Sequence, residues 1–424
     1  MNKRHILIAT DSYNGKLATA NGICVQHIAE EFLKHDYNVD VLCYRHKNEK
    51  SYEETKKIRL YRIRVNLVHY FRFAYESGQN RLIREISKLL MVTLNRIQTL
   101  ICIHWFPMRA PFFSRRYARE MKKLYKKNNY GMIISSYCPF EAAYAGWRTK
   151  KEFGATVCLY SLDSLSNFSG NKFFLTEESQ KEKGRRWEKV FFDAYDCVLQ
   201  MKCHQVYYEG DVYNKYKNKF KYVDFPHITD HQKENKHYNN YLLMYVGSIR
   251  TSYFTQVIDL LEPFISDKYL LEIYGGNTSA DLGIERSKLM KINLSLKGRV
   301  DHDKLIQIEE EAGCFLSMGN YGSSSNFVPS KIFEYISTGK KMIHFYKNPN
   351  DSCLPYLKNY KACCLVNVDD NKDKSIKIIE DFLKSEVGII PSEEIKKVYL
   401  VNTPEYTYSI INEYLNKTYD ISMT

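Results

Sequence analysis

Short apolar runs alternate with stretches of helical periodicity along the chain, and this alternation restricts the fold more than any other feature. Residues 5–10 (HILIAT) and 39–44 (VDVLCY) are apolar runs, and between them apolar side chains recur three and four positions apart from Ile23 to Leu33. This order predicts strand, helix and strand. A β-α-β unit with two parallel strands follows from it.

The alternation continues in two blocks. In the first we predict strands at 58–65, 132–134, 156–160 and 197–201, with helices at 140–150 and 184–194. In the second we predict strands at 241–246, 270–274, 294–297, 314–318 and 341–345, with helices at 255–265, 287–292, 302–312 and 330–337. Each block therefore predicts a doubly wound, Rossmann-like α/β domain.

A polar stretch, residues 224–240 (DFPHITDHQKENKHYNN), separates the two blocks and offers almost nothing to bury. We therefore predict an N-terminal domain over 1–223, a linker over 224–240 and a C-terminal domain over 241–402. Residues 403–424 have helical spacing and are predicted to form a last helix.

Positive charge is concentrated in the first domain. Residues 1–240 carry 41 Lys and Arg against 25 Asp and Glu, whereas residues 241–424 carry 21 against 24. This excess predicts an anionic partner for the first half, either a membrane surface or a nucleic acid. Because no DNA- or RNA-binding module is recognisable and the cations are interleaved with aliphatic runs, we expect no nucleic acid.

Residues 68–127 interrupt the α/β alternation with a basic, apolar-rich stretch. Arg84, Lys88 and Arg96 divide its apolar residues into windows shorter than a membrane span requires. We therefore predict an amphipathic element that lies on an anionic membrane surface. Four aromatic residues beside its cations favour this interpretation: Trp105, Phe106, Phe112 and Phe113. The alternative is a core helix with a solvated basic face.

Eleven cysteines are scattered along the chain, without a C-x-x-C pair. No secretory leader precedes the first predicted strand, so we expect a reducing cytoplasm. Because no Cys or His cluster has the spacing of metal ligands, we expect no metal site.

The most informative segment is residues 319–345 (GNYGSSSNFVPSKIFEYISTGKKMIHF). Ser330 suits a helix N-cap and Gly339 a left-handed C-cap, so we predict a helix that begins at Ser330–Lys331. Its first N–H groups and the ammonium of Lys331 could bind a diphosphate. Glu334, one turn further, could accept hydrogen bonds from the hydroxyls of a ribose. The alternative is a capped helix on which Lys331 and Glu334 are ordinary surface residues.

Two glycine-containing turns follow predicted strands of the second block. Gly247 and Arg250 come after 241–246, and Gly275 comes after 270–274. Ligands bind open α/β sheets at the carboxyl ends of strands, where glycine permits close backbone approach and Arg250 could hold a phosphate. Neither G-x-G-x-x-G nor a P-loop is present, which argues against a nicotinamide enzyme or a P-loop kinase.

Several segments together resemble a known family. VPSKIFEYISTGKKMIHF, YVGSIR, LEIYGG, LKGRVDHDKL and NTPEY are similar to the C-terminal domain of retaining GT-B glycosyltransferases of family 4, the glycogen-synthase-like group common in bacterial surface-polysaccharide synthesis. ISSYCPFEAAYAG and LYSLDS resemble the N-terminal domain of that family more loosely. The resemblance covers nearly the whole chain. It implies two Rossmann-like domains that face each other across a cleft, with the last helix crossing back to the first domain.

On the donor side, the resemblance implies a role for each matching position. Glu334 would hold the donor ribose, Ser330 and Lys331 would contact the nucleotide, Arg250 would approach the diphosphate, and Val300 would lie against the base. Together with Gly247 and Gly275, these residues would form the donor site. Lys331 and Arg250 would also be catalytic, because they neutralise the departing diphosphate.

Two donor-side positions depart from the family. The lysine that usually follows the family's arginine by about five residues is absent, since Thr255 and Gln256 stand there, so diphosphate neutralisation would fall on Arg250 and Lys331. The family's E-x7-E pattern has a first glutamate where this chain has Asn326. An asparagine can still hydrogen-bond a sugar hydroxyl, so Asn326 stays in the predicted donor site.

On the acceptor side we expect Asn21, Gly22, Ser136 and Asp163. Ser136 is a departure, because it stands with Ser135 and Tyr137 where the family often has a histidine at the end of a central strand. Asp163 is the candidate catalytic carboxylate there, with a helix N-cap as its alternative role.

The resemblance implies an enzyme that moves a sugar from a nucleotide diphosphate-sugar, of UDP or GDP type, with retention and without a metal or other cofactor. Its acceptor would be a glycan or lipid-linked molecule at the inner face of the plasma membrane, which makes the enzyme a cytoplasmic, peripheral membrane protein. Three alternatives stay open: an inactive GT-B homologue that only binds, a GT-B-fold nucleotide-sugar epimerase, and a nucleic-acid-binding protein.

Overall fold

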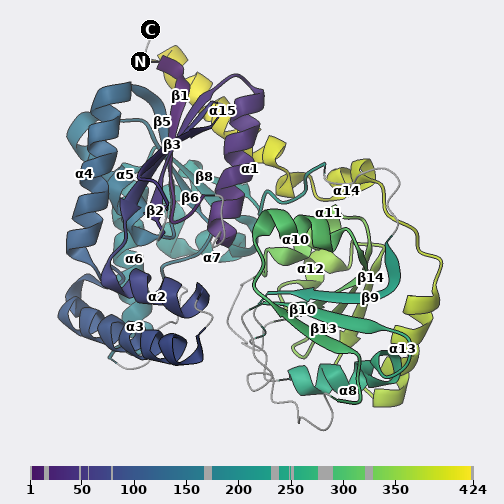
Figure 1. Cartoon of the computed structure of the whole chain (residues 1–424). Helices are drawn as coiled ribbons and strands as arrows, with labels where there is room; N and C mark the ends of the chain where they lie inside the picture. The colour runs from purple at the N-terminus through teal and green to yellow at the C-terminus, as the bar shows by residue number, and fades with distance from the viewer. Residues whose placement is uncertain are drawn as a thin grey trace. The chain divides into compact units, whose positions relative to one another are not determined.

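The structure is a computed structural model of the chain (Figure 1). It describes residues 2–13, 19–46, 49–55, 57–77, 80–166, 174–230, 238–247, 249, 253–275, 290–319 and 328–421. The chain divides into two compact units, unit 1 (Met1–Pro226 with Pro404–Thr424) and unit 2 (His227–Thr403). Each unit has its own sheet.

Unit 1 is built on an eight-stranded sheet with the order β3-β4-β2-β1-β5-β6-β7-β8. Neighbouring strands are parallel, except that β3 and β4 are antiparallel. The strands are β1 Asn2–Ala9, β2 Asn38–Arg45, β3 Tyr52–Thr55, β4 Ile58–Arg64, β5 Tyr130–Ser136, β6 Val157–Ser161, β7 Cys197–Met201 and β8 Phe220–Val223. The chain winds away from β1 in one direction through β2 and β4, and in the other direction from β5 onward.

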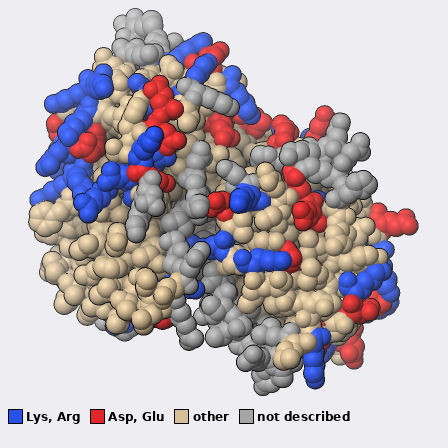
Figure 2. Space-filling view, viewed as in Figure 1, with Lys and Arg blue, Asp and Glu red and all other residues tan. Residues whose placement is uncertain are grey.

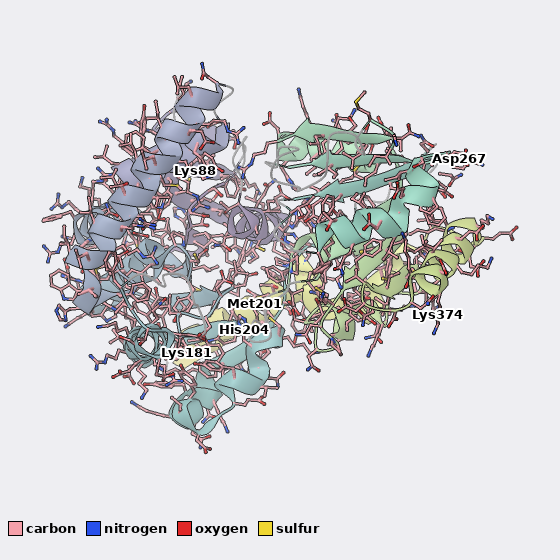
Figure 3. The ribbon with its side chains drawn as sticks, turned by 90° about the horizontal axis from the view of Figure 1, so that it is seen from below. Lys88, Lys181, Met201, His204, Asp267 and Lys374 are labelled. Carbon is pink, nitrogen blue, oxygen red and sulfur yellow. The ribbon has the colours of Figure 1, made fainter. Side chains whose placement is uncertain are left out.

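Helices cover both faces of this sheet. Buried residues of α4 (Pro111–Asn128), α5 (Phe140–Phe153) and α6 (Glu177–Ala194) join one core cluster with the strands. α1 (Ala20–Lys34) and α15 (Pro404–Ile421), from opposite ends of the chain, lie side by side (Figure 1). The short helix α7 (Gln205–Tyr208) follows β7, and Figure 3 labels Met201, the last residue of β7, and His204, the residue before α7.

Specific contacts fix α15 and α4 on unit 1. The rings of Phe32 on α1 and Tyr408 on α15 have centroids 4.9 Å apart. The buried hydroxyl of Tyr117 on α4 lies 2.9 Å from the carbonyl oxygen of Thr10, directly after β1, and 2.6 Å from that of Leu42, inside β2. A buried hydroxyl needs such partners, so Tyr117 fixes how α4 sits on β1 and β2.

Two helices at the surface of unit 1, α2 (Leu67–Ser77) and α3 (Arg81–Ile101), pack against each other. On α3 the small polar residues Ser87 and Thr99 are buried, whereas the large apolar side chains face solvent. The exposed ones are Leu82, Ile83, Ile86, Leu89, Leu90, Ile97, Leu100 and Ile101. This is the reverse of an ordinary surface helix, which buries its apolar stripe. Within the described ranges, no helix combines the length and hydropathy of a membrane span.

Figure 2 shows a broad face nearly free of charged residues over α2 and α3, with Lys and Arg gathered over α4. The aromatic residues of this region divide between two environments. Trp105 and Phe112 are exposed, whereas Phe106 and Phe113 are buried. For α4 the structure therefore matches the alternative interpretation, a core helix with a solvated basic face. The exposed apolar surface belongs to α2 and α3.

Unit 2 has a six-stranded, all-parallel sheet with the order β11-β10-β9-β12-β13-β14. Its strands are β9 Asn239–Val246, β10 Leu270–Tyr274, β11 Leu294–Gly298, β12 Ala312–Met318, β13 Lys341–Tyr346 and β14 Cys363–Asn367. Its helices are α8 Phe254–Ile265, α10 His302–Glu309, α11 Lys331–Ser337, α12 Leu354–Leu357, α13 Lys372–Lys384 and α14 Ser392–Val398. α8 and α13 share a core cluster with the strands.

Some local predictions differ from the structure. α1 begins at Ala20 rather than after Gly22, because the side chain of Thr19 caps it by accepting from the N–H of Gly22 at 3.1 Å. The polar stretch at 224–240 buries more than its composition suggests, since Phe225 and Ile228 are buried and β9 already begins at Asn239. Of the predicted helix at 287–292, residues 287–289 lie outside the described residues, and residues 290–292 form a turn and bend rather than a helix.

Candidate functional site

In unit 2, the strand order reverses between β9 and β12, and ligands of open α/β sheets bind at such a reversal, beyond the carboxyl ends of the strands. Backbone hydrogen bonds tie the strand ends together. The N–H of Gly247 donates to the carbonyl of Tyr274 at 2.8 Å, and the N–H of Gly275 donates to the carbonyl of Gly298 at 2.9 Å. Gly247 has φ +132°, which favours glycine. Val300 follows β11 by two residues and is half-buried.

The structure thus brings Gly247, Gly275 and Val300 to one edge of the sheet. Two other predicted donor-site residues, Arg250 and Asn326, lie outside the described residues.

The helix α11 begins at Lys331, as predicted, but Ser330 does not cap it. Ser330 has helical dihedrals (φ −59°, ψ −27°) and its side chain makes no capping hydrogen bond, because a capping side chain needs extended backbone at that position. α11 has seven residues, less than two turns, so its dipole contributes little to anion binding. The charges of its side chains matter more.

Tyr335 fixes α11 against the sheet. Its hydroxyl accepts a hydrogen bond from the N–H of Val246 at 2.8 Å, at the last residue of β9. Its ring stacks on that of Phe315 in β12, with centroids 4.3 Å apart and planes 10° apart. α11 is therefore held at the strand reversal, between the ends of β9 and β12.

A cluster of three charged side chains lies beside this helix. Nζ of Lys331 forms an ion pair with Oε1 of Glu309 at 3.2 Å and another with Oε2 of Glu334. Glu309 comes from the last turn of α10 and is buried. The cluster has two carboxylates for one ammonium, so Lys331 is already neutralised within the protein.

The three groups shift one another's pKa values. Burial raises the pKa of Glu309 to about 7, despite the lowering effect of Lys331. Burial would also raise the pKa of Glu334, but the charge of Lys331, reinforced by His227 and His302, lowers that pKa to about 2. Burial would lower the pKa of Lys331, yet the two carboxylates raise it. Glu334 is thus an ionised, nearly buried acceptor of hydrogen bonds, as a ribose-binding carboxylate must be.

Sequence reasoning missed Glu309. It follows the buried Leu305 by four positions, which places it on the apolar side of α10. That spacing was the available signal, because a carboxylate on an apolar face needs a buried partner. Lys340 adds to the same region, as its Nζ donates to the carbonyls of Glu310 at 2.6 Å and Ala312 at 2.9 Å at the end of α10.

In unit 1, the strand order reverses between β1 and β5, and the predicted acceptor-side residues gather there. Ser136 is the last residue of β5, is buried, and its hydroxyl has no hydrogen-bond partner among the described residues. Asn21 donates from Nδ2 to the carbonyl of Cys138 at 2.8 Å. Gly22 packs so closely that a Cβ there would lie 2.7 Å from the backbone oxygen of Ser12.

Asp163 lies two residues beyond β6, and burial raises the pKa of its carboxyl group. It is not a helix N-cap within the described chain, because α6 begins at Glu177 and is capped by Thr176. The neighbouring loop is anchored by Glu188, whose Oε1 accepts from the hydroxyl of Ser164 and the N–H of Ser166, both at 3.0 Å. The loop that carries Asp163 is therefore anchored to the core of unit 1.

Two further carboxylates lie at these strand ends and were missed. Asp11 follows β1 directly and accepts from the hydroxyl of Thr19 at 2.8 Å. Glu141, in the first turn of α5, accepts from the hydroxyl of Tyr44 at 3.0 Å. Burial raises the pKa of both, and their mutual repulsion adds to it for Glu141. The rule that ligand-binding residues follow strands, applied to β1, would have found Asp11.

The fold, though not the sequence, is similar to solved glycosyltransferases. WaaG, a glycosyltransferase involved in lipopolysaccharide biosynthesis, matches with a TM-score of 0.53 and 11% identity over 96% of this chain and 99% of its own. The catalytic domain of starch synthase IV from Arabidopsis thaliana matches at 0.57 and 9% over 97% and 98%. TarM from S. aureus matches at 0.57 and 11% over 98% and 99%.

No family model matches the chain, and no curated protein matches it in sequence. At identities this low, the structural likeness defines the fold. With two parallel-sheet, Rossmann-like units and near-complete coverage on both sides, the protein has the GT-B fold of these glycosyltransferases.

Proposed function

We propose that the protein is a retaining glycosyltransferase that moves a sugar from a nucleotide diphosphate-sugar to a membrane-associated, lipid-linked or glycan acceptor in cell-surface polysaccharide synthesis. The observation that carries the proposal is the ionised, nearly buried Glu334 on α11, at the strand reversal of a GT-B-fold unit. Two solved relatives in fold hold nucleoside diphosphates, ADP in starch synthase IV and UDP in TarM.

The donor would bind in unit 2. Glu334 would accept hydrogen bonds from the ribose, with Ser330 beside the nucleotide and Val300 against its base. Gly247 and Gly275 leave the strand ends without side chains, which suits a diphosphate close to the backbone. Asn326 would hydrogen-bond the sugar.

Departure of the diphosphate needs positive charge, which Arg250 and Lys331 would supply without a metal at the reacting phosphates. In the ligand-free protein Lys331 is shared between Glu309 and Glu334. Protonation of Glu309, whose pKa is raised to about 7, would remove one of the two negative charges beside Lys331. More of the positive charge of Lys331 would then act on a bound phosphate. The departing phosphate would then help to remove the proton of the acceptor hydroxyl on the same face of the sugar, which gives retention.

The acceptor would be bound by unit 1, where Asn21, Gly22, Ser136 and Asp163 surround the ends of β1, β5 and β6. Asp163 would contact the acceptor hydroxyl. Because burial raises its pKa, this carboxyl can hold or accept a proton nearer to neutral pH than an exposed aspartate can.

A membrane-associated acceptor is supported by the surface of unit 1. The exposed apolar side chains of α3 would enter the interface of a bilayer. Their exposure to water costs free energy, and contact with lipid removes this cost. Lys88 on α3 and the cations of α4 lie beside this surface (Figures 2 and 3). A groove of about 580 Å³ between α4 and α5 is lined by five of these α4 cations, by Arg148 of α5 and by one carboxylate, Glu152, which pairs with Lys122. The five are Arg115, Arg119, Lys122, Lys123 and Lys126. Their charge suits the phosphates of anionic lipids at the cytoplasmic face.

The test is a transfer assay with purified protein, UDP- and GDP-sugars, and a lipid extract from cells that make surface polysaccharide. We expect release of nucleoside diphosphate that depends on the extract, a product with the anomeric configuration of the donor, and no increase in rate on adding Mg²⁺ or Mn²⁺. Asp163→Asn should lower the rate while Asp193→Asn, an exposed aspartate on α6, should not.

Each alternative predicts another result. An epimerase would release nucleoside diphosphate or a new sugar without any acceptor. A binding protein that has lost catalysis would bind the nucleotide and transfer nothing. Absence of both binding and transfer for every donor would contradict the proposal.

A further inference from the structure

Three potential metal ligands lie together near the carboxyl ends of β12 and β13. They are the imidazole of His344, the carboxylate of Asp351 and the thiol of Cys353, and one ligand atom from each lies within 4.8 Å of the other two. All three residues are buried. Along the sequence they are separated by seven and two positions, which is why no ligand spacing is visible there.

The histidine is oriented toward the other two residues. His344 in β13 pairs in register with Ser317 in β12, and its Nδ1 lies 3.1 Å from the hydroxyl of Ser317. Its Nε2 is 3.8 Å from Oδ1 of Asp351, too long for a hydrogen bond, and has no hydrogen-bond partner among the described residues. A buried ring nitrogen without a partner is costly, and a metal ion is one group that satisfies it.

The carboxylate and thiol are held in place by the turn that precedes α12. Oδ1 of Asp351 accepts from the N–H of Cys353 at 2.8 Å, an Asx-type turn that sets the two side chains at fixed separation. An imidazole held through its other nitrogen, a carboxylate and a thiol are all ligand types of Zn²⁺ in proteins, and together they fill three of its four tetrahedral positions.

We propose that His344, Asp351 and Cys353 bind a zinc ion that stabilises unit 2. The ion would join β13 to the turn before α12. The hydrogen bond between His344 and Ser317 would link it indirectly to β12. None of the three residues is among the proposed donor residues, and the proposal does not depend on the proposed sugar transfer.

Its position gives the ion a structural consequence. The N–H of Gly319, the residue after β12, donates to the carbonyl of Phe345 at 2.9 Å, and a side chain at 319 would collide with the carboxylate of Asp351. The chain therefore leaves β12 directly against a proposed ligand. Zinc bound there would fix the point at which the segment after Gly319 begins.

Untagged protein, stripped of metal and dialysed against Co²⁺, provides the direct test. We expect about one equivalent of cobalt per chain and a near-ultraviolet thiolate-to-cobalt charge-transfer band, together with a higher melting temperature in Zn²⁺ than after stripping. Cys353→Ser should lose the band, and His344→Gln should weaken metal retention at least tenfold. Cys363→Ser, in β14 of the same unit, is the matched control and should keep both.

Several outcomes would overturn the proposal. One is wild-type protein that retains no stoichiometric cobalt or zinc after dialysis, and another is a band that survives Cys353→Ser or disappears in Cys363→Ser. If Cys353→Ser does not fold by circular dichroism, the wild-type stoichiometry and His344→Gln decide. None of these readouts involves nucleotide or sugar, so failure here leaves the proposed function untouched.

Discussion

Nζ of Lys331 lies 3.2 Å from Oε1 of Glu309, 22 positions earlier in the chain, and also pairs with Glu334 one turn along α11. One buried and one nearly buried carboxylate thus share one ammonium at the edge of the unit 2 sheet. The charge of Lys331 lowers the pKa of Glu334, whereas burial raises the pKa of Glu309 to about 7 despite Lys331. Because the three groups shift one another's pKa values, replacing any one of them should change the ionisation of the rest.

The raised pKa of Glu309 predicts a pH-dependent stability. Its folded-state pKa of about 7 lies above the ordinary 4.5, so the folded protein binds the proton more tightly and stability falls as pH rises between these values. We expect the contribution of Glu309 to fall by an amount on the order of 2 kcal/mol from pH 5 to pH 8, measured as the difference between wild type and Glu309→Gln. The lowered pKa values of His69 and His204 add stability over part of this window, but equally in both proteins. The lowered pKa of Glu334 acts only below about pH 4.5, outside this window. Urea unfolding across pH 5–8 measures the effect. If the free energy of unfolding changed with pH equally in wild type and variant, the prediction would be contradicted.

Removal of the central cation should be more damaging than removal of one carboxylate. Lys331→Met leaves Glu309 and Glu334 buried together without a counter-charge, and we expect a cost of about 3–5 kcal/mol at pH 8. The double variant Lys331→Met with Glu309→Gln should recover part of that loss. A double-mutant cycle by denaturant unfolding gives the coupling, and additive effects would mean that the two residues do not interact.

The sequence predicted the central strands because parallel strands buried on both faces read as apolar runs. The strands that it missed, β3, β8 and β14, all lie at sheet edges. β3 (YEET) keeps polar residues because an edge strand is paired on one side only, so its apolar signal is weak. β14 (CCLVN) does carry an apolar run, which the prediction left out. Strand ends were a good guide to where Gly247 and Gly275 lie in unit 2 and where Asp163 lies in unit 1, since within each sheet the topology brings the carboxyl ends of the parallel strands to one edge.

What the sequence could not provide were partners that only the fold supplies. The pairing of Lys331 with Glu309 depends on how α10 packs beside α11, and the meeting of His344 with Asp351 depends on a turn after β13. Ser330 was a reasonable N-cap by residue type, but its helical backbone prevents that role. Such features arise from tertiary packing, which local propensity does not encode.

Close packing at the start of α1 predicts that Gly22 cannot be enlarged. A Cβ at Gly22 would lie 2.7 Å from the backbone oxygen of Ser12 and collide with its hydroxyl, so Gly22→Ala should cost about 1–3 kcal/mol. Gly388 has open space around it, and Gly388→Ala should be nearly neutral. Thermal unfolding of both variants checks this, and a stable Gly22→Ala protein would show that the contact relaxes freely.

The exposed apolar face of α3 predicts binding to anionic vesicles. Wild-type protein should sediment with phosphatidylglycerol vesicles, less with phosphatidylcholine, and less still at high salt. Leu89→Glu should weaken binding about tenfold or more, because a charge enters the apolar interface. Val398→Glu, an exposed apolar position on α14, is the control and should bind normally. Equal sedimentation of both variants would contradict a role for α3.

The most direct measurement is calorimetric titration of wild-type protein and Glu334→Gln with UDP, GDP and ADP. We expect at least one nucleoside diphosphate to bind, with a loss of tenfold or more, at least about 1.4 kcal/mol, in Glu334→Gln. Glu393→Gln, an exposed glutamate of α14, should bind as wild type does. If no nucleotide binds, or if Glu334→Gln binds as tightly as wild type, then the carboxylate of α11 does not hold a donor nucleotide.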